Sequence, residues 1–156
     1  MILSVILFWP LAVGLLAWLS ERWGGGWPRR IAAASLGLHL AAVAALWIWS
    51  PGGSPWILEV DRPWVPELGI AYHLALDGLS LLLILLTSTL GLTAVLASWA
   101  DEPRRPGFYH LNLLWILSAL VGAFLALDLA LFYLLWEMML VPLYFLIGIW
   151  GYERRT

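Results

Sequence analysis

The stretch LSLLLILLTSTLGLTAVLASWA at residues 79–100 contains no charged side chain, and it decides the class of fold. A second stretch, IAAASLGLHLAAVAALWIW at residues 31–49, also lacks Asp, Glu, Lys and Arg. The hydrocarbon core of a bilayer is about 30 Å thick, so a helix needs about 20 apolar residues to cross it. Both stretches have that length and therefore predict transmembrane helices.

The composition of the whole chain agrees with a membrane protein. Of its 156 residues, 63% are hydrophobic and 12% are charged, whereas a soluble domain carries about 25% charged residues. Because the chain has no cysteine, it has no disulfides, thiolate metal sites or Cys-ligated iron–sulfur clusters of its own. The net charge of −2 and the paired arginines do not indicate a nucleic-acid partner. These properties exclude a soluble enzyme.

Five apolar spans predict an all-α, polytopic transmembrane bundle, and we expect residues 1–156 to form a single membrane domain. The first span carries no charge before Glu21. A secretory signal begins with a positive region, so we expect this span to be retained as a helix, with a kink at Pro10. Only Asp128 separates the last two spans, which predicts an antiparallel helical hairpin. The five predicted spans are residues 2–19, 31–49, 77–99, 109–127 and 129–150.

The arginines predict the orientation of the bundle. If the helices alternate in direction, the segments 20–30, 100–107 and 151–156 lie on one side of the membrane. That side then holds seven of the eight arginines, and the other side holds only Arg62. Cytoplasmic loops are enriched in Lys and Arg, so we expect the N-terminus outside and the C-terminus in the cytoplasm. The seven arginines are Arg22, Arg29, Arg30, Arg104, Arg105, Arg154 and Arg155.

Glu137 is the strongest candidate for a functional residue, because it lies near the middle of the fifth span. Acidic groups at this depth are costly and usually face a bundle interior or a water-filled cavity. Burial favours the neutral carboxyl and a nearby cation favours the charged form, so a group between these influences can load and release protons. The alternative is a permanently neutral Glu137 that is hydrogen-bonded inside the bundle.

The residues around Glu137 predict either a packed site or ordinary helix packing. Pro142 has no N–H, so the carbonyl of Met138 loses its helical partner; a resulting kink would loosen the backbone beside the carboxylate. A proline tolerated in a membrane helix is the alternative. Two tyrosines offer hydroxyls, and a glycine permits close helix approach. The residues on the same helical face as Glu137 are Tyr133, Val141, Tyr144 and Gly148.

No permanent cation in this chain reaches Glu137 at mid-depth. The chain has no lysine, and all its arginines lie in loops or at termini. A cationic partner therefore lies in another chain or in sequence beyond these residues. His39, on the second span, either pairs with Glu137 or hydrogen-bonds within the bundle, whereas His110 is expected at an interface. Asp77 and Asp128 precede spans as helix N-caps do.

Two motifs resemble one family of membrane subunits. They are FYHLNLLWIL at residues 108–117 and WEMMLVPLYFLIGIWG at residues 136–151, and the sequence DGLS at 77–80 also matches. These motifs are similar to subunit M (chain 4) of the proton-pumping NADH–quinone oxidoreductase, respiratory complex I. They resemble it more than the sister chains L and N or the subunits of multisubunit sodium/proton antiporters.

The resemblance implies a proton-translocating subunit in a complex that couples electron transfer from NADH to quinone to proton pumping. Glu137 matches a glutamate that pairs, in that family, with a lysine on a later helix. The resemblance further implies other membrane subunits as partners, protons as the transported species, and a multi-pass location in the bacterial inner (cytoplasmic) membrane. Redox centres and cofactors would belong to other subunits, with none in this chain. We also expect 1–156 to be the N-terminal part of a longer antiporter-like subunit, or a truncated product.

Two other functions stay open from the sequence. One is an antiporter-type subunit of a multisubunit sodium/proton antiporter or of a membrane-bound hydrogenase. The other is a purely structural membrane piece in which Glu137 has no role in proton transfer.

Overall fold

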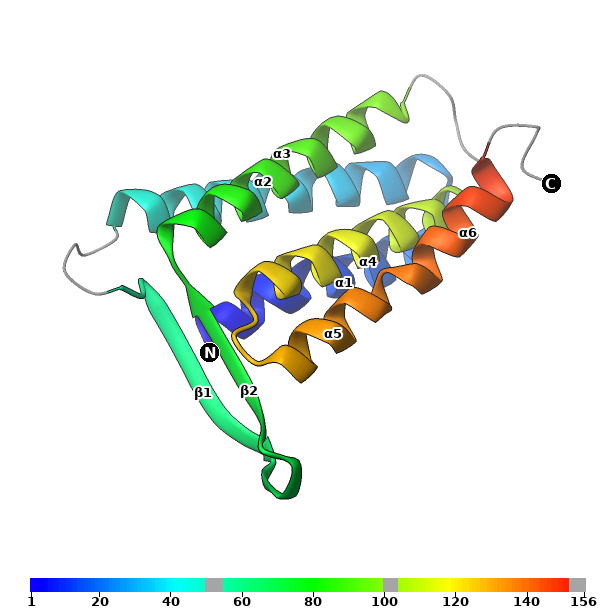
Figure 1. Ribbon diagram of the computed structural model, residues 1–156. Coiled ribbons are helices and arrows are strands. Elements are labelled where there is room, and N and C mark those ends of the chain that lie inside the picture. The colour runs from blue at the N-terminus through cyan, green and yellow to red at the C-terminus, as the bar shows by residue number, and fades with distance from the viewer. Residues whose placement is uncertain (50–54, 100–103, 152–156) are drawn as a thin grey trace.

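Figure 1 shows the computed structural model as a bundle of long helices with a β-hairpin at one end. The structure describes residues 1–49, 55–99 and 104–151. Arg154 and Arg155, which the orientation argument uses, lie outside the described residues. The elements in chain order are α1 (Ile2–Ser20), η1 (Glu21–Trp23), α2 (Gly26–Trp49), β1 (Leu58–Val65), η2 (Pro66–Leu68), β2 (Ile70–Leu76), α3 (Gly78–Ala97), α4 (Pro106–Leu125), α5 (Leu129–Met138) and α6 (Leu140–Trp150).

The prediction of five membrane spans is confirmed. Within the described ranges, five helical segments are long and apolar enough to cross a bilayer, and the fifth consists of α5 and α6 together. The second span begins at Gly26 rather than at residue 31, because Pro28 takes a place in the first helical turn, where a missing N–H costs nothing. The fourth span runs from Pro106 to Leu125, and its first turn again contains a proline.

The prediction of an all-α fold is wrong in the segment between α2 and α3. Strands β1 and β2 pair antiparallel, with Leu58 opposite Leu76 and Asp61 opposite His73. Leu58 and Val60 pack against the core while Glu59 is exposed, which is the alternation of a half-buried strand. Pro63 falls where the register shifts, the kind of irregularity that tolerates proline in a strand.

Helix α4 is the centre of the bundle, and the fifth span lies at its edge. Within the most apolar part of each span, 61% of the residues are buried in α4, but only 17% are buried in the span formed by α5 and α6. The carbonyl of Leu7 in α1 accepts a hydrogen bond from the hydroxyl of Ser118 in α4. Gly122 lets α1 and α5 pack close to α4: a Cβ there would lie 2.5 Å from Leu7 Cδ1 and 2.9 Å from Leu135 Cδ2.

The two ends of the bundle differ in charge. At one end the indole of Trp150 donates to the carbonyl of Arg104 at 2.8 Å, and the guanidinium of Arg29 lies 5.5 Å from the ring centre of Trp99. These contacts bring the start of α2, the end of α3, the start of α4 and the end of α6 together. The hairpin, with Arg62, lies at the opposite end beside the N-terminus (Figure 1). The described arginines are therefore divided between the ends as the sequence predicted.

Asp128 ties the hairpin to the start of α5. One carboxylate oxygen accepts the N–H of Leu131 at 3.0 Å, which confirms the predicted N-cap. The other accepts the N–H of Ala71 in β2, also at 3.0 Å. Asp77 caps α3 in the predicted way, accepting the N–H of Ser80 at 2.7 Å. The two carboxylates thus fix where α3 and α5 begin beside the hairpin.

We expect the hairpin to loosen from α5 in acid. The backbone N–H of Ala71, followed by that of Leu131, lowers the pKa of Asp128 below its usual value. The unfolded chain therefore takes up the proton first, so the stabilisation is complete above the unfolded-state pKa and is lost as pH falls through the folded-state pKa. Amide hydrogen exchange at Ala71, measured against pH, checks this. Asp128→Asn should show the fast exchange already at neutral pH, and equal exchange in both proteins would contradict the role of Asp128.

We expect Gly122→Val to destabilise the bundle. The added side chain meets leucines from both α1 and α5, and overpacking of this kind costs about 1–3 kcal/mol. Gly148→Val is the matched control, because a Cβ at Gly148 meets nothing within 4 Å in the described chain. Thermal unfolding in detergent micelles measures both. If the Gly122→Val and Gly148→Val proteins unfolded at the same temperature, the contact between α1, α4 and α5 would not be tight.

Candidate functional site

Glu137 lies within the fifth membrane span, close to its middle. It comes eight residues after Leu129, where α5 begins, and thus about 12 Å along the helix axis by helical rise. The span continues to Trp150. Its position along the fifth helical span is therefore the one expected from the sequence.

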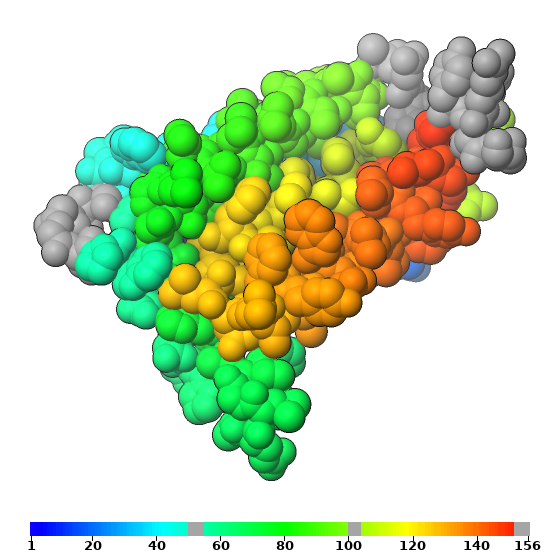
Figure 2. Space-filling view, viewed as in Figure 1, coloured from blue at the N-terminus to red at the C-terminus, as the bar shows by residue number. Residues whose placement is uncertain are grey.

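The side chain of Glu137 faces away from the bundle. In α5 the buried residues are Leu131 and Leu135, which contact the core, while Glu137 is exposed. Figure 2 shows α5 and α6 as a continuous outer band of the molecule, with no other part of the described chain in front of them. A carboxylate at this depth that faced hydrocarbon would be costly, so this face requires a covering by protein or water.

The predicted packed site around Glu137 does not form within this chain. Tyr133 is 61% exposed and Tyr144 is 74% exposed, and Val141 shares the same open face. Gly148, expected to allow close helix approach, has no neighbour within 4 Å of an added Cβ in the described residues. The helical spacing does place these residues on one face, but the elements that would pack on that face are not among those described.

Tyr133 is a polar neighbour of Glu137 in the same helix. Its phenol lies one helical turn before the carboxylate, at the spacing at which two helical side chains can interact. Among the described residues, no arginine or histidine forms an ion pair with Glu137; the described ion pair joins His73 and Glu59 in the hairpin. Because the chain also has no lysine, the described residues supply no cationic partner for Glu137 at this depth.

The backbone breaks directly after Glu137, as the position of Pro142 predicts. Helix α5 ends at Met138 and α6 begins at Leu140. The N–H of Met139 turns to the carbonyl of Trp136 at 3.2 Å, and the carbonyl of Met138 faces a proline that has no N–H to give. The carbonyl freed in this way belongs to the residue after Glu137 and faces Pro142, which is buried.

His39 does not pair with Glu137. It is buried in α2 with only 4% of its surface exposed. Its Nε2 lies 3.1 Å from the carbonyl oxygen of Ile6 in α1, and its Nδ1 lies 2.9 Å from the hydroxyl of Ser88 in α3. Of the two alternatives for His39, the hydrogen bonds within the bundle are the ones formed.

His110 lies near the start of α4, as the sequence indicated, and it is buried there with 1% of its surface exposed. Its Nδ1 lies 2.7 Å from the carbonyl oxygen of Pro106, while Nε2 has no partner in the described chain. In the sequence, the signal for this hydrogen bond was the spacing, because His110 follows Pro106 by four residues at the start of a helix.

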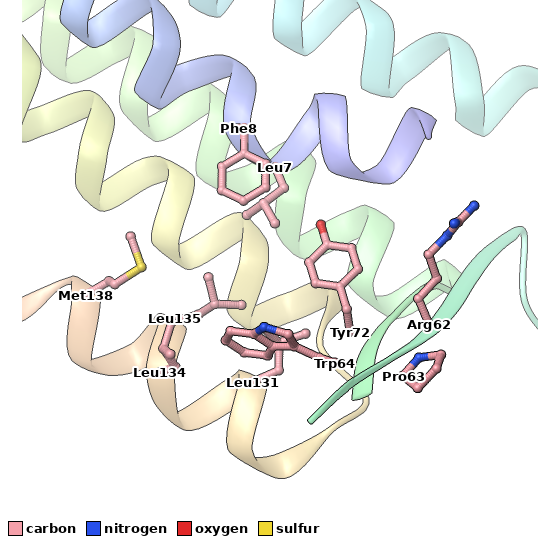
Figure 3. Close-up of a pocket in the computed structure, with 10 residues that line it drawn as sticks. All are labelled: Leu7, Phe8, Arg62, Pro63, Trp64, Tyr72, Leu131, Leu134, Leu135 and Met138. Carbon is pink, nitrogen blue, oxygen red and sulfur yellow. The ribbon is translucent and has the colours of Figure 1, made fainter. Parts of the chain in front are cut away.

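An apolar cavity of about 360 Å³ lies between α1, the hairpin and α5. Figure 3 shows Trp64 and Tyr72 from the hairpin facing the leucines of α5, with Arg62 at the edge. The lining includes no acidic residue and excludes Glu137. This cavity is therefore separate from the candidate proton site.

The sequence comparisons agree with the motifs. No family model matches the chain. Over 160 residues the chain is 48% identical to the NADH-quinone oxidoreductase subunit M of Escherichia coli (strain K12), covering 98% of this chain and 31% of the relative. It is 49% identical over 163 residues to the subunit M of Pseudomonas aeruginosa, covering 98% of this chain and 32% of the relative. The chain thus spans about a third of the length of these curated relatives.

The structural comparisons give the same result. The fold matches a chain of respiratory complex I from Thermus thermophilus with bound NADH, with a TM-score of 0.81, 28% identity, and coverage of 99% of this chain and 30% of that chain. It also matches a chain of the membrane-bound sulfane sulfur reductase, an archaeal respiratory membrane complex, with a TM-score of 0.74, 27% identity, and coverage of 96% and 23%. The resemblance predicted from the motifs is confirmed: over 98% of its length, this multi-pass membrane chain is homologous to part of subunit M of NADH–quinone oxidoreductase.

Proposed function

We propose that this chain serves proton translocation as part of an M-type, antiporter-like subunit of an NADH–quinone oxidoreductase. The observation that carries the proposal is the position of Glu137: a carboxylate near mid-span, on an uncovered face, beside a helix break. Intramembrane acids of this kind line ion and proton pathways. The homology to subunit M over nearly the whole chain supports the same function.

The proton chemistry follows from two states of Glu137. A cation brought against the carboxylate favours its charged form, and withdrawal of that cation in a medium of low dielectric constant favours the neutral, protonated form. Moving the cation therefore releases and reloads one proton. Tyr133, one helical turn before the carboxylate, orients it, and the break between α5 and α6 follows Glu137 closely in the chain.

The partner that supplies the cation also covers the exposed face of α5 and α6. Because the chain spans about 31% of the length of its relative from Escherichia coli, we propose a lysine- or arginine-bearing helix as this partner, from a neighbouring membrane subunit or further subunit sequence. Such a helix explains both the uncovered face and the missing cation.

In this proposal the chain contributes to an enzyme without carrying its redox chemistry. It acts as a subunit of a proton-translocating NADH:quinone oxidoreductase, and NADH, quinone and redox cofactors bind to other subunits. We place it in the bacterial inner membrane, with the N-terminus outside and the arginine-rich end in the cytoplasm, in accordance with the positive-inside rule.

A second candidate is an antiporter-type subunit of a sodium/proton antiporter or a hydrogenase-like membrane complex. The structural match to the sulfane sulfur reductase complex favours retaining it, because that chain has the same fold in a different respiratory complex. Co-purification with NADH dehydrogenase activity supports the first function. Sodium-dependent proton exchange in membrane vesicles without such activity supports the second.

We expect Glu137→Gln to reduce NADH-driven proton pumping by about tenfold or more, the loss expected when a positioned proton-transfer group is removed. The substitution retains shape and removes the titratable group. Proton uptake by inside-out membrane vesicles that contain the assembled complex measures the effect, with assembly checked by native gel electrophoresis. Glu67→Gln, in the exposed turn η2, is the matched control. Normal pumping with Glu137→Gln would favour a purely structural chain.

We expect a membrane-impermeant maleimide to label Glu67→Cys in intact cells and Trp23→Cys only after permeabilisation. The reason is that the hairpin and η1 lie at opposite ends of the bundle and the arginine-rich end belongs to the cytoplasm. The chain has no native cysteine, so the unsubstituted protein is a clean control. The reverse labelling pattern would invert the proposed orientation.

A further inference from the structure

The buried centre of the bundle contains a second titratable group, His39, whose hydrogen bonds join three helices. The ring belongs to α2, its Nε2 lies 3.1 Å from the Ile6 carbonyl oxygen of α1, and its Nδ1 lies 2.9 Å from Ser88 Oγ of α3. The Ser88 hydroxyl also lies 2.8 Å from the carbonyl oxygen of Ile84. Ile6 and Ile84 are buried core residues, and Ile6 and His39 also line an apolar cavity of about 290 Å³.

The Ile6 carbonyl is available to His39 because of Pro10. In a regular helix the carbonyl of residue 6 accepts from the N–H of residue 10. Pro10 lies inside α1 and has no N–H. The Ile6 oxygen is an acceptor only, so the ring nitrogen that faces it, Nε2, carries a proton. This fixes the tautomer of the neutral ring, with the unprotonated lone pair on Nδ1.

The hydrogen count at Ser88 admits two arrangements. The hydroxyl has one hydrogen and two acceptors near it, the Nδ1 lone pair and the Ile84 carbonyl. When the ring is neutral, the hydroxyl donates to Nδ1 and leaves Ile84. When Nδ1 binds a proton, Nδ1–H donates to Ser88 Oγ and the hydroxyl turns to Ile84. Every donor and acceptor in the second arrangement is paired.

We propose that His39, Ser88 and the carbonyls of Ile6 and Ile84 form a second proton-binding site, which takes one proton at Nδ1 while the Ser88 hydroxyl turns from the ring to Ile84. One N–H bond forms at Nδ1, no covalent bond breaks in the chain, and the net charge of the site rises by one. The two oxygens that contact the ring, from Ile6 and Ser88, stabilise the cation. The site lies inside α1, α2 and α3 and is distinct from Glu137 on the outer face of α5.

No described carboxylate serves as a counter-ion to the ring. Helices α1 and α3 carry no titratable side chain. The titratable groups on the other elements packed against α2 lie toward the arginine-rich end: Arg29 and Arg30 at the start of α2 itself, Glu21 and Arg22 in η1, and Tyr109 and His110 at the start of α4. The neutral ring is therefore the resting state, and the proton is held only by the oriented oxygens.

The site is tested in the full chain in lipid nanodiscs, by NMR of histidine ring nitrogens labelled with ¹⁵N. Between about pH 8 and about pH 5, His39 is expected to change from a ring protonated only at Nε2 to one protonated at both nitrogens, with the helical circular dichroism unchanged. The chain has three histidines, so His39→Gln and His73→Gln assign the signals. A His39 ring that retains one proton throughout this range overturns the proposal.

Ser88→Ala and Ser35→Ala separate proton binding from packing and keep His39 in place. Ser88→Ala removes the oxygen that accepts from the cation, and bonds to charged groups are about twice as strong as neutral ones. The doubly protonated fraction at about pH 5 is therefore expected to fall about fivefold. Ser35→Ala removes a hydroxyl that accepts from Trp9 Nε1 at 2.9 Å and should leave the titration unchanged. Equal titrations of both variants would overturn the role of Ser88. The experiment needs no proton pumping, so its outcome is independent of the role proposed for Glu137.

Discussion

The constraint on which this structure depends is that a bilayer interior offers no hydrogen-bond partners, so every polar group at that depth must find one within protein. The five apolar spans satisfy their backbone groups as helices, and the one described pair of strands lies at the end of the bundle. Where a proline interrupts a helix, one carbonyl loses its backbone partner. That carbonyl either accepts a hydrogen bond from another group or remains free to take part in chemistry. Pro10 and Pro142 give one example of each outcome.

At Pro10 the substitute is internal. The carbonyl of Ile6 receives His39 from the neighbouring helix, so the interruption is repaired by a side chain that also bonds to Ser88 of a third helix. The irregularity therefore contributes to tertiary structure and brings an imidazole into a place where packing alone would favour a leucine. A buried polar network of this kind is stable only when each member is paired.

At Pro142 the repair is incomplete within this chain. The break between α5 and α6 follows Glu137 closely in the chain, with Pro142 on the buried side of the helix and Glu137 on the side where the described chain offers no cover. Tyr133 supplies a hydroxyl, but one hydroxyl does not balance a carboxylate at membrane depth. The cost of leaving this face to lipid is the physical reason to expect a cationic partner there, independently of any resemblance to known subunits.

The sequence was sufficient for features that depend on local pattern. Hydropathy predicted the five spans, and the short polar residues Asp77 and Asp128 predicted the caps. The sequence was insufficient where the outcome depends on which face of a helix or strand packs against which other element. Leu58, Glu59 and Val60 alternate as in a strand, but they lie in a proline-rich segment. Prolines favour a loop unless a bulge accommodates them, and the sequence does not reveal the bulge. Spacing placed Tyr133 and Gly148 beside Glu137, but no helical periodicity states whether that face is covered.

The two titratable groups at membrane depth thus differ in what they need from outside the chain. His39 has its hydrogen-bond partners inside the bundle, on two other helices of the same chain, α1 and α3. Glu137 has one polar neighbour one turn away and an open face. A group whose partners are fixed has a proton affinity set by the fold, whereas a group whose counter-charge is external has a proton affinity that changes when the neighbour moves. Energy from a distant reaction can act on the second kind of group through a moving cation, and it has no comparable means of acting on the first. Of the two, Glu137 is therefore the group that we propose for converting motion in a neighbouring element into release of a proton.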